Sequence, residues 1–445
     1  MNFLEFKTGS VRRLITTAFF AQAGALLSLS LASLLVARAT SAAVVGEYAL
    51  LRVLPWLMAV VCSSGLPVAA AYFLAAPGRR DRRLRPTITV MVVLAGVAGA
   101  ALWAVAARLL HPVYFPSFSP GLLSLTSVLV ITQLVTVTAK ACCQGAGDIK
   151  AANAVTVAEE LLFLPWYLAV LLLGLGHSRG VVVALVGGGA SASVLGVALA
   201  ARTGFFRRGG RPSVAIARRV AWYGARGQTG NVLWLLNLRL DFLILGAIAG
   251  PATLGVYAIA SKFAELMRLG PIAINYVLYP RFSALPARES VADARHLLPR
   301  ATLAVATAAP VIAAATVVVL PLLYGDAFDG ALVPACIIIV GLIPEGAAAV
   351  SSALLWGLGR PGANSLAMAV GLVATVVLDI LLIPHFGATG AAIASATAYL
   401  VTTAVLLMVA ARAAHVIDAG GTRESLLAGR ADQAPRTPAN VESVV

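Results

Sequence analysis

Residues 79–110 read RRDRRLRPTITVMVVLAGVAGAALWAVAARLL, a basic run followed by a long apolar segment. The apolar part is long enough to cross the hydrocarbon core of a bilayer, for which a helix needs about 20 residues. Only helices and closed barrels satisfy every backbone hydrogen bond in that core. Because the apolar residues are continuous rather than alternating, the pattern excludes a barrel and predicts a transmembrane helix.

Comparable apolar segments recur along the whole chain. Of its 445 residues, 60% are hydrophobic and 11% are charged, and the mean hydropathy is +0.92. Soluble domains are about 45–50% apolar and about 25% charged, so this composition indicates that the bilayer is the solvent. We expect an all-α polytopic membrane protein with about twelve spans, at approximately 14–37, 46–74, 87–110, 120–143, 152–175, 180–202, 226–249, 253–280, 298–324, 331–357, 363–384 and 388–412. The first of these exceeds the apolar region of a signal peptide and is expected to stay uncleaved.

The distribution of Lys and Arg predicts the orientation of the chain. With the N-terminus inside, 26 of the 33 basic residues fall in segments on the inner side, whereas the opposite loops hold Arg38 and Arg179. Such an excess marks the cytoplasmic side of a membrane protein. Both termini are therefore expected in the cytoplasm. The net charge of +15 then reports topology, and a nucleic-acid partner is not expected.

An internal repeat divides the spans into two halves. GEYA at 46–49 opens the second span and GVYA at 255–258 opens the eighth, 209 residues later. GAG at 145–147 corresponds to GLG at 357–359, an offset of 212 residues, and each lies between the fourth and fifth spans of its half. Halves with an even number of spans share one orientation, so a pseudo-two-fold axis along the membrane normal relates them.

The repeat predicts the organisation of the whole chain. We expect an N-terminal six-helix bundle at 1–205, a basic cytoplasmic linker at 206–225, a C-terminal six-helix bundle at 226–412 and a disordered cytoplasmic tail at 413–445. Paired bundles of this kind commonly enclose a central cavity whose access alternates between the two sides of the membrane.

Ionisable residues inside the spans mark the expected working surface, because each costs at least a few kcal/mol unless it has a partner or a function. The seventh and eighth spans are the most polar. The candidates for a substrate-binding cavity are Arg52, Arg239, Lys262, Arg268, Asn237 and Asn275. The candidates for ion coupling or internal ion pairs are Asp241, Glu265, Glu345 and Asp379. Glu159 and Glu160 add charge near the inner end of the fifth span.

Lys262, Glu265 and Arg268 are spaced three apart, so they share one broad helix face that keeps a net positive charge. That charge suits an anionic headgroup passing through a cavity. The alternative is that the buried charges are structural ion pairs, for example Arg239 with Glu345 or Arg268 with Asp241.

Other chemistries have little support in the sequence. The four cysteines form no CxxC pair and have no histidine at ligand spacing, so neither a metal nor a cofactor is expected. A phosphate-binding Gly-Lys-Ser/Thr loop is absent from the sequence, which argues against ATP-driven transport by this chain alone. No large loop with catalytic residues is available, so an enzyme is not expected.

The residues also resemble a family. The stretch from Arg239-Leu240-Asp241 through GPATLGVY at 250–257 to Pro280-Arg281-Phe282, with similar motifs at 324–328, 357–361 and 382–392, resembles polysaccharide and O-antigen flippases. These belong to the multidrug/oligosaccharidyl-lipid/polysaccharide exporter superfamily. The resemblance implies that an undecaprenyl-pyrophosphate-linked oligosaccharide is moved from the cytoplasmic to the outer leaflet of a bacterial inner membrane. A basic lining would hold the pyrophosphate, while the number of intramembrane acids departs from a purely cationic cavity.

Two other functions remain open at this point. A cation-coupled drug or metabolite antiporter of the same superfamily would prefer acidic residues in its cavity, and a membrane enzyme of glycan assembly has less support. The expected partners are the lipid-linked glycan, the lipid bilayer, and a glycan polymerase or glycosyltransferases of the same pathway.

Overall fold

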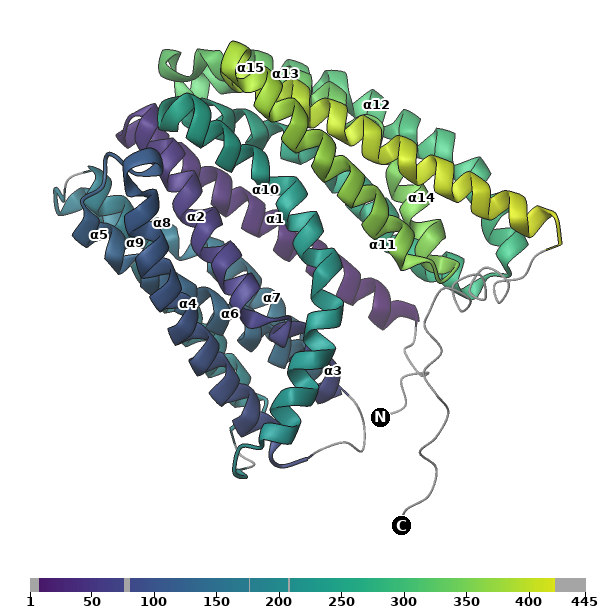
Figure 1. Cartoon of the computed structure of the whole chain (residues 1–445), viewed down its shortest axis with the longest axis horizontal. Coiled ribbons are helices and arrows are strands. Elements are labelled where there is room, and N and C mark those ends of the chain that lie inside the picture. Colours follow the sequence, from purple (N-terminus) through teal and green to yellow (C-terminus); the bar gives the residue numbers. More distant parts are fainter. Residues whose placement is uncertain (1–7, 76–80, 176, 207–208, 421–445) are drawn as a thin grey trace. The chain divides into compact units, whose positions relative to one another are not determined.

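The computed structural model describes residues 8–75, 81–175, 177–206 and 209–420, and within these ranges all regular elements are helices (Figure 1). In chain order they are α1 (Thr8–Ala39), α2 (Ala42–Ser63), α3 (Leu66–Ala75), α4 (Leu84–Tyr114), α5 (Pro120–Leu125), α6 (Ser127–Gly145), α7 (Ile149–Leu161), α8 (Phe163–Leu172), α9 (His177–Arg202), α10 (Val214–Glu265), η1 (Leu266–Arg268), α11 (Leu269–Ala284), α12 (Ala287–Tyr324), η2 (Asp326–Ala331), α13 (Leu332–Gly341), α14 (Glu345–Gly357) and α15 (Pro361–Asp418).

The number of spans agrees with the hydropathy pattern. Among the described residues, nine helical segments are long and apolar enough to cross a membrane, and Asp326–Gly341 with Glu345–Gly357 adds a tenth, bent by 43°. Two of the nine, Leu235–Ala284 and Gly362–Asp418, are each as long as two spans. Dividing both at their internal breaks gives twelve, so the predicted all-α polytopic fold is confirmed.

Glycines in unusual backbone conformations make those internal breaks. Gly250 has φ 79° and ψ 172° inside α10, and Gly387 has φ 53° and ψ −127° inside α15. A positive φ is accessible to glycine because it has no Cβ. Pro251 and Pro384 lie beside these positions and lack the backbone N–H that a continuous helix needs. Gly250 falls between the predicted spans 226–249 and 253–280, and Gly387 falls between 363–384 and 388–412, so both breaks agree with the predicted spans.

The second predicted span, 46–74, differs from the structure. α2 ends at Ser63, Ser64 and Gly65 take positive φ values of 46° and 75°, and α3 follows as a separate helix. A Cβ on Gly65 would lie 2.2 Å from the carbonyl oxygen of Gly224, so this turn allows the two backbones to meet. Hydropathy does not report such a turn, because the residues on both sides remain apolar.

Two predicted polar segments are partly helical. α10 already begins at Val214, within the predicted linker. α15 continues to Asp418, within the segment predicted as a tail, because Ala413 and Ile417 are buried in a hydrophobic cluster with Phe282 and Leu354. Residues 421–445 of that tail lie outside the described residues.

The chain forms two compact units by its internal contacts. Unit 1 comprises Met1–Lys262, Val319–Leu332 and Ile383–Ala388, and unit 2 comprises Phe263–Val318, Val333–Leu382 and Thr389–Val445. Unit 1 therefore contains the first six spans together with the seventh and the beginning of the eighth.

Within unit 1, the two repeated motifs pack against each other. A Cβ on Gly46 would lie 2.0 Å from the oxygen of Pro251, and a Cβ on Gly255 would lie 1.9 Å from the oxygen of Ala42. Each glycine thus faces the residue four positions before its counterpart. The contact is reciprocal, as a local two-fold relation between the repeats requires.

A second pair of glycines supports the repeat, one inside each unit. In unit 1, a Cβ on Gly145 would lie 2.8 Å from the Leu74 side chain, where α6 packs on α3. In unit 2, a Cβ on Gly357 would lie 2.6 Å from the Phe282 side chain, where α14 packs on α11. The glycines are 212 residues apart and their neighbours are 208 apart, close to the offset found in the sequence.

Candidate functional site

A charged cluster lies within unit 1. Arg52 on α2 forms an ion pair with Glu160 on α7, and both side chains are 21% exposed. The Arg52 guanidinium carbon also lies 5.8 Å from the ring centroid of Tyr48, one turn earlier on α2. A cation over an aromatic face gains electrostatic attraction where water is excluded. Arg52, a predicted cavity residue, therefore has an aromatic and an acidic partner.

A second ion pair lies beside the first. Lys140 on α6 has its Nζ 3.7 Å from Oε2 of Glu159, the residue adjacent to Glu160. Two neighbouring carboxylates on α7 thus each take a cation from a different helix. The two pairs balance their formal charges, so these four residues together carry no net charge. The sequence located Glu159 and Glu160 but gave no signal for their partners, because α2, α6 and α7 are distant in the chain.

Asp241 is the buried acid of α10. Its Oδ2 accepts a hydrogen bond of 2.7 Å from the Tyr257 hydroxyl, and its Oδ1 accepts one of 2.9 Å from the backbone N–H of Phe242. The Arg239 guanidinium carbon lies 5.3 Å from the Phe242 ring centroid. Tyr257 belongs to the repeated motif at 255–258, so a residue that the repeat singled out also solvates a candidate coupling acid.

Unit 2 holds a partly buried arginine–carboxylate contact. Arg268, in η1, has its Nη2 3.4 Å from Oε1 of Glu345, the first residue of α14, and the two side chains are 17% and 22% exposed. The same guanidinium lies 4.9 Å from the ring centroid of Tyr399 on α15. The Asn275 amide on α11 donates to the carbonyl oxygen of Ala349 on α14 at 3.2 Å. Arg268 therefore connects three elements of this unit.

Local sequence explains the position of Arg268. Pro271 has no N–H to donate to the residue four positions earlier, Met267, and the chain adopts the 3₁₀ turn Leu266–Arg268 at this point. This 3₁₀ turn ends at Arg268, the residue that meets Glu345.

The other predicted site residues lie on the same helices. Asn237 and Lys262 are partly buried on α10, as is Glu265 at its end, and Asp379 is fully buried on α15. Arg52, Asn237, Arg239, Asp241 and Lys262 belong to unit 1, whereas Glu265, Arg268, Asn275, Glu345 and Asp379 belong to unit 2. A cavity shared by all of them stays a prediction.

One internal ion pair of the predicted kind is present, between Arg268 and Glu345. The pairs suggested from the sequence, Arg239 with Glu345 and Arg268 with Asp241, stay predictions. Asp241 receives the hydroxyl of Tyr257. Among the described residues, no group of three or more His, Cys, Asp or Glu side chains could hold a metal ion.

Comparison with known proteins gives a family and a shared fold. Residues 35–333, about two thirds of the chain, match the family described as "Polysaccharide biosynthesis protein". No curated protein matches the sequence significantly.

Solved structures of membrane transporters share the fold. The lipid II flippase MurJ in an inward closed conformation superposes with a TM-score of 0.70 at 12% identity, over 89% of this chain and 86% of that one. A multidrug resistance MATE family transporter of the MOP superfamily, inward-facing, gives 0.69 at 14% identity, over 89% and 96%. The MATE multidrug transporter DinF-BH gives 0.66 at 14% identity, over 92% and 96%.

Proposed function

Because this chain belongs to the polysaccharide biosynthesis protein family, we propose that it is a transporter that moves a lipid-linked oligosaccharide from the cytoplasmic to the outer leaflet of a bacterial inner membrane. The carrier lipid is undecaprenyl pyrophosphate. The family match is the main support for this proposal. It is a match of the amino-acid sequence itself, and it covers most of the membrane-spanning region. The role is binding and movement, with no covalent bond made or broken in the cargo.

The fold supports a transporter but does not separate its substrates. The lipid II flippase and the two multidrug transporters superpose about equally well, with TM-scores of 0.70, 0.69 and 0.66. A cation-coupled drug or metabolite antiporter is therefore the second candidate. The family match favours the oligosaccharide.

The two partly buried contacts, Arg52–Glu160 and Arg268–Glu345, suggest how an anionic cargo binds. Arg52 and Arg268 lie in apolar spans, and both they and their acidic partners retain 17–22% exposure. A guanidinium is well suited to a phosphate group because its N–H donors match the spacing of two oxygens. A diphosphate that reaches either arginine competes with the paired carboxylate, Glu160 or Glu345. The displaced carboxylate then takes up a proton or a cation, which couples cargo binding to an ion gradient.

The predicted topology gives the direction of transport. The basic loops and both termini are placed in the cytoplasm, where glycosyltransferases assemble the lipid-linked glycan, and a polymerase acts after transport. We include these enzymes as expected partners of the pathway.

A deletion strain tests the cargo. Deleting the gene should abolish one surface polysaccharide and leave its lipid-linked precursor in the cytoplasmic leaflet, measured by glycan extraction and by enzymatic accessibility of the precursor in spheroplasts and inverted vesicles. Normal surface polymers together with altered drug tolerance would instead support antiport and reject the flippase.

Complementation tests the site. Arg52→Gln and Arg268→Gln should each restore surface polysaccharide poorly at normal protein levels, because each removes a guanidinium proposed to hold the diphosphate. Arg281→Gln is the matched control, since Arg281 also pairs with an acid, Asp293, but its side chain is 55% exposed. Full complementation by both test variants would remove these arginines from the proposed site.

A further inference from the structure

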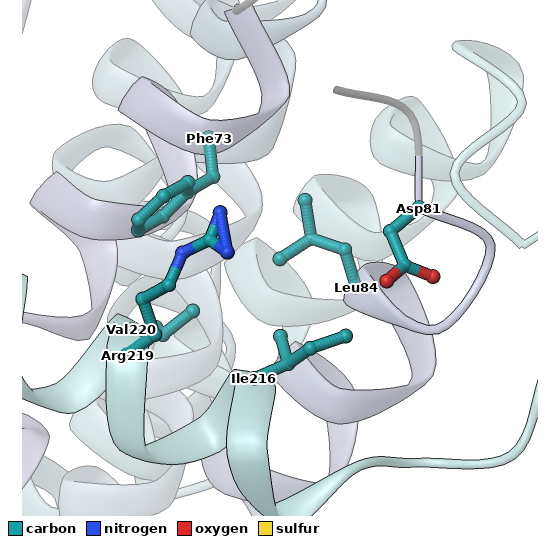
Figure 2. A pocket seen from close by; sticks show the side chains of 6 residues that line it. All are labelled: Phe73, Asp81, Leu84, Ile216, Arg219 and Val220. Atoms are coloured by element: carbon teal, nitrogen blue, oxygen red, sulfur yellow. The ribbon is translucent and has the colours of Figure 1, made fainter. Parts of the chain in front are cut away.

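A pocket in unit 1 lies outside the charged site described above. It is lined by Phe73, Asp81, Leu84, Ile216, Arg219 and Val220 (Figure 2). Phe73 comes from the last turn of α3, Leu84 opens α4, and the last three residues belong to the first turns of α10. Phe73, Leu84 and Val220 are buried and form an apolar wall.

Arg219 supplies the charge of the pocket. Its guanidinium carbon lies 5.4 Å from the Phe73 ring centroid, and the side chain is exposed. Stacking on the ring occupies the face of the guanidinium and leaves its N–H edges available. Within the described residues, no carboxylate lies within ion-pair distance of Arg219.

Asp81, the acid of the pocket, has a different role. Its Oδ1 accepts the backbone N–H of Arg83 at 2.9 Å and so caps the turn that leads into α4. Figure 2 shows the Leu84 side chain between Asp81 and the Arg219 guanidinium. Asp81 forms no ion pair with Arg219 in the structure.

The walls of the pocket are held together by contacts between distant segments. The Arg85 guanidinium donates to the carbonyl oxygen of Gly204 and lies 5.8 Å from the Phe205 ring centroid. The backbone N–H of Ser213 donates to Oγ1 of Thr87 at 3.0 Å. These contacts fix the start of α4 to the segment that leads into α10, so the pocket is formed before any ligand arrives.

We expect the pocket to lie close to the membrane–water interface. It lies at the end of α3 and the beginning of α4, where an apolar span meets the basic side of the chain. Trp222, 59% exposed on α10, lies one turn beyond Arg218 and Arg219, and tryptophan is enriched at membrane interfaces. Four further arginines of the same two segments are exposed: Arg82, Arg83, Arg211 and Arg218.

We propose that this pocket binds the phosphate of an anionic phospholipid of the surrounding bilayer, with Arg219 as its main contact and Leu84, Ile216 and Val220 against the glycerol and the first methylenes. Basic pockets between helices on the cytoplasmic side of membrane proteins suit such headgroups. The site is separate from the proposed transport site, because it requires neither Arg52 nor Arg268, and it does not depend on the identity of the cargo.

The test compares two single-charge variants of the full chain. The protein is purified from liposomes that contain phosphatidylglycerol and phosphatidylcholine, and retained lipid is counted by native mass spectrometry. Arg219→Gln should lower retained phosphatidylglycerol roughly fivefold, the factor that corresponds to about 1 kcal/mol for one basic residue near an anionic surface. Arg218→Gln removes the same charge from the adjacent residue outside the pocket and should change retention much less. Equal losses in both variants would mean diffuse surface charge, and no loss in either would also overturn the site.

Two further measurements test whether the ring of Phe73 contributes to the site and whether its ligand is a lipid. Phe73→Leu keeps the charge but removes the ring that orients Arg219, and it should lose part of the preference for phosphatidylglycerol while its melting temperature stays close to that of the parent. Millimolar inorganic phosphate should not release the bound lipid. Its release by phosphate at that concentration would mark a soluble-anion site and reject a lipid ligand.

Discussion

At the scale of single residues, the Asp241–Tyr257 hydrogen bond can be tested for its contribution to the stability of the protein. Tyr257→Phe removes the 2.7 Å donor to Oδ2 of Asp241 and changes little in volume. Hydrogen bonds between helices in membranes contribute about 1 kcal/mol. We expect a loss of that size, measured as a lower free energy of unfolding in detergent. Tyr276→Phe, at an exposed position of α11, is the control and should be neutral within about 0.5 kcal/mol.

Arg268 and Glu345 form the second residue-scale prediction. Either Arg268→Gln or Glu345→Gln alone leaves a partly buried charge without this partner, and the double variant removes both charges. A double-mutant cycle on thermal unfolding should give a coupling energy of about 1–3 kcal/mol. The exposed Arg281–Asp293 pair should give about 0–1 kcal/mol in the same assay. Equal coupling in the two pairs would mean that the membrane environment of Arg268 adds nothing.

The sequence predicted the charged residues of the site better than their partners. Arg52, Arg268 and Glu345 can be identified from the sequence because each is a charged residue within an apolar span. The sequence does not reveal that Arg52 meets Glu160, since α2 and α7 are brought together by packing on α6, and 108 residues separate the two side chains. A cation and an acid can each choose among several partners until the helices are placed.

At the scale of helices, the close approach of α2 and α10 depends on two positions without side chains. Gly46→Ala and Gly255→Ala would each place a methyl group about 2 Å from a carbonyl oxygen of the opposite helix. Backbone cannot move as a flexible side chain can, so we expect each variant to lose about 1–3 kcal/mol of stability or more. Melting temperature and monodispersity in size-exclusion chromatography measure the effect.

Gly121→Ala is the control for this prediction. Gly121 lies in α5, and a Cβ there would meet nothing within 4 Å. Alanine favours a helix over glycine by about 1 kcal/mol, so this variant should be neutral or more stable. If Gly46→Ala behaved like Gly121→Ala, the observed helix contact would be wrong.

The sequence predicted helix boundaries correctly where glycine and proline occur together. Gly250 with Pro251 marked a real break, whereas the turn at Ser64 and Gly65 passed unnoticed inside one apolar run. A positive φ at a serine is set by the backbone of Gly224 on α10, and a single-sequence pattern contains no information about that neighbour.

At the scale of the whole molecule, the distribution of Lys and Arg predicts the membrane topology. After replacement of the native cysteines, Ser117→Cys should react with a membrane-impermeant maleimide in intact spheroplasts, because the loop after α4 is expected outside. Arg211→Cys, in the segment between α9 and α10, should react only after permeabilisation. Both positions are exposed in the structure, so access to the reagent is comparable. The reverse pattern of labelling would invert the protein and the proposed direction of transport.

Composition and hydropathy could not predict the cargo, and the overall fold shows why. The same arrangement of helices serves a lipid II flippase and multidrug transporters at 12–14% identity to this chain. Substrate choice therefore depends on the identity and position of side chains, which an average over the spans does not report.

The meeting of Gly46 with Gly255 has a consequence for how such a chain can change over time. Each motif uses one surface patch to touch the same patch on its copy, which is the isologous arrangement found in homodimers with two-fold symmetry. In a true homodimer, one codon alters both sides of the contact together. Here the copies are encoded separately, so a bulkier residue on one side meets an unchanged partner and has to be accommodated by a compensating change elsewhere. Positions of the two copies that lie away from this contact can diverge without meeting that constraint.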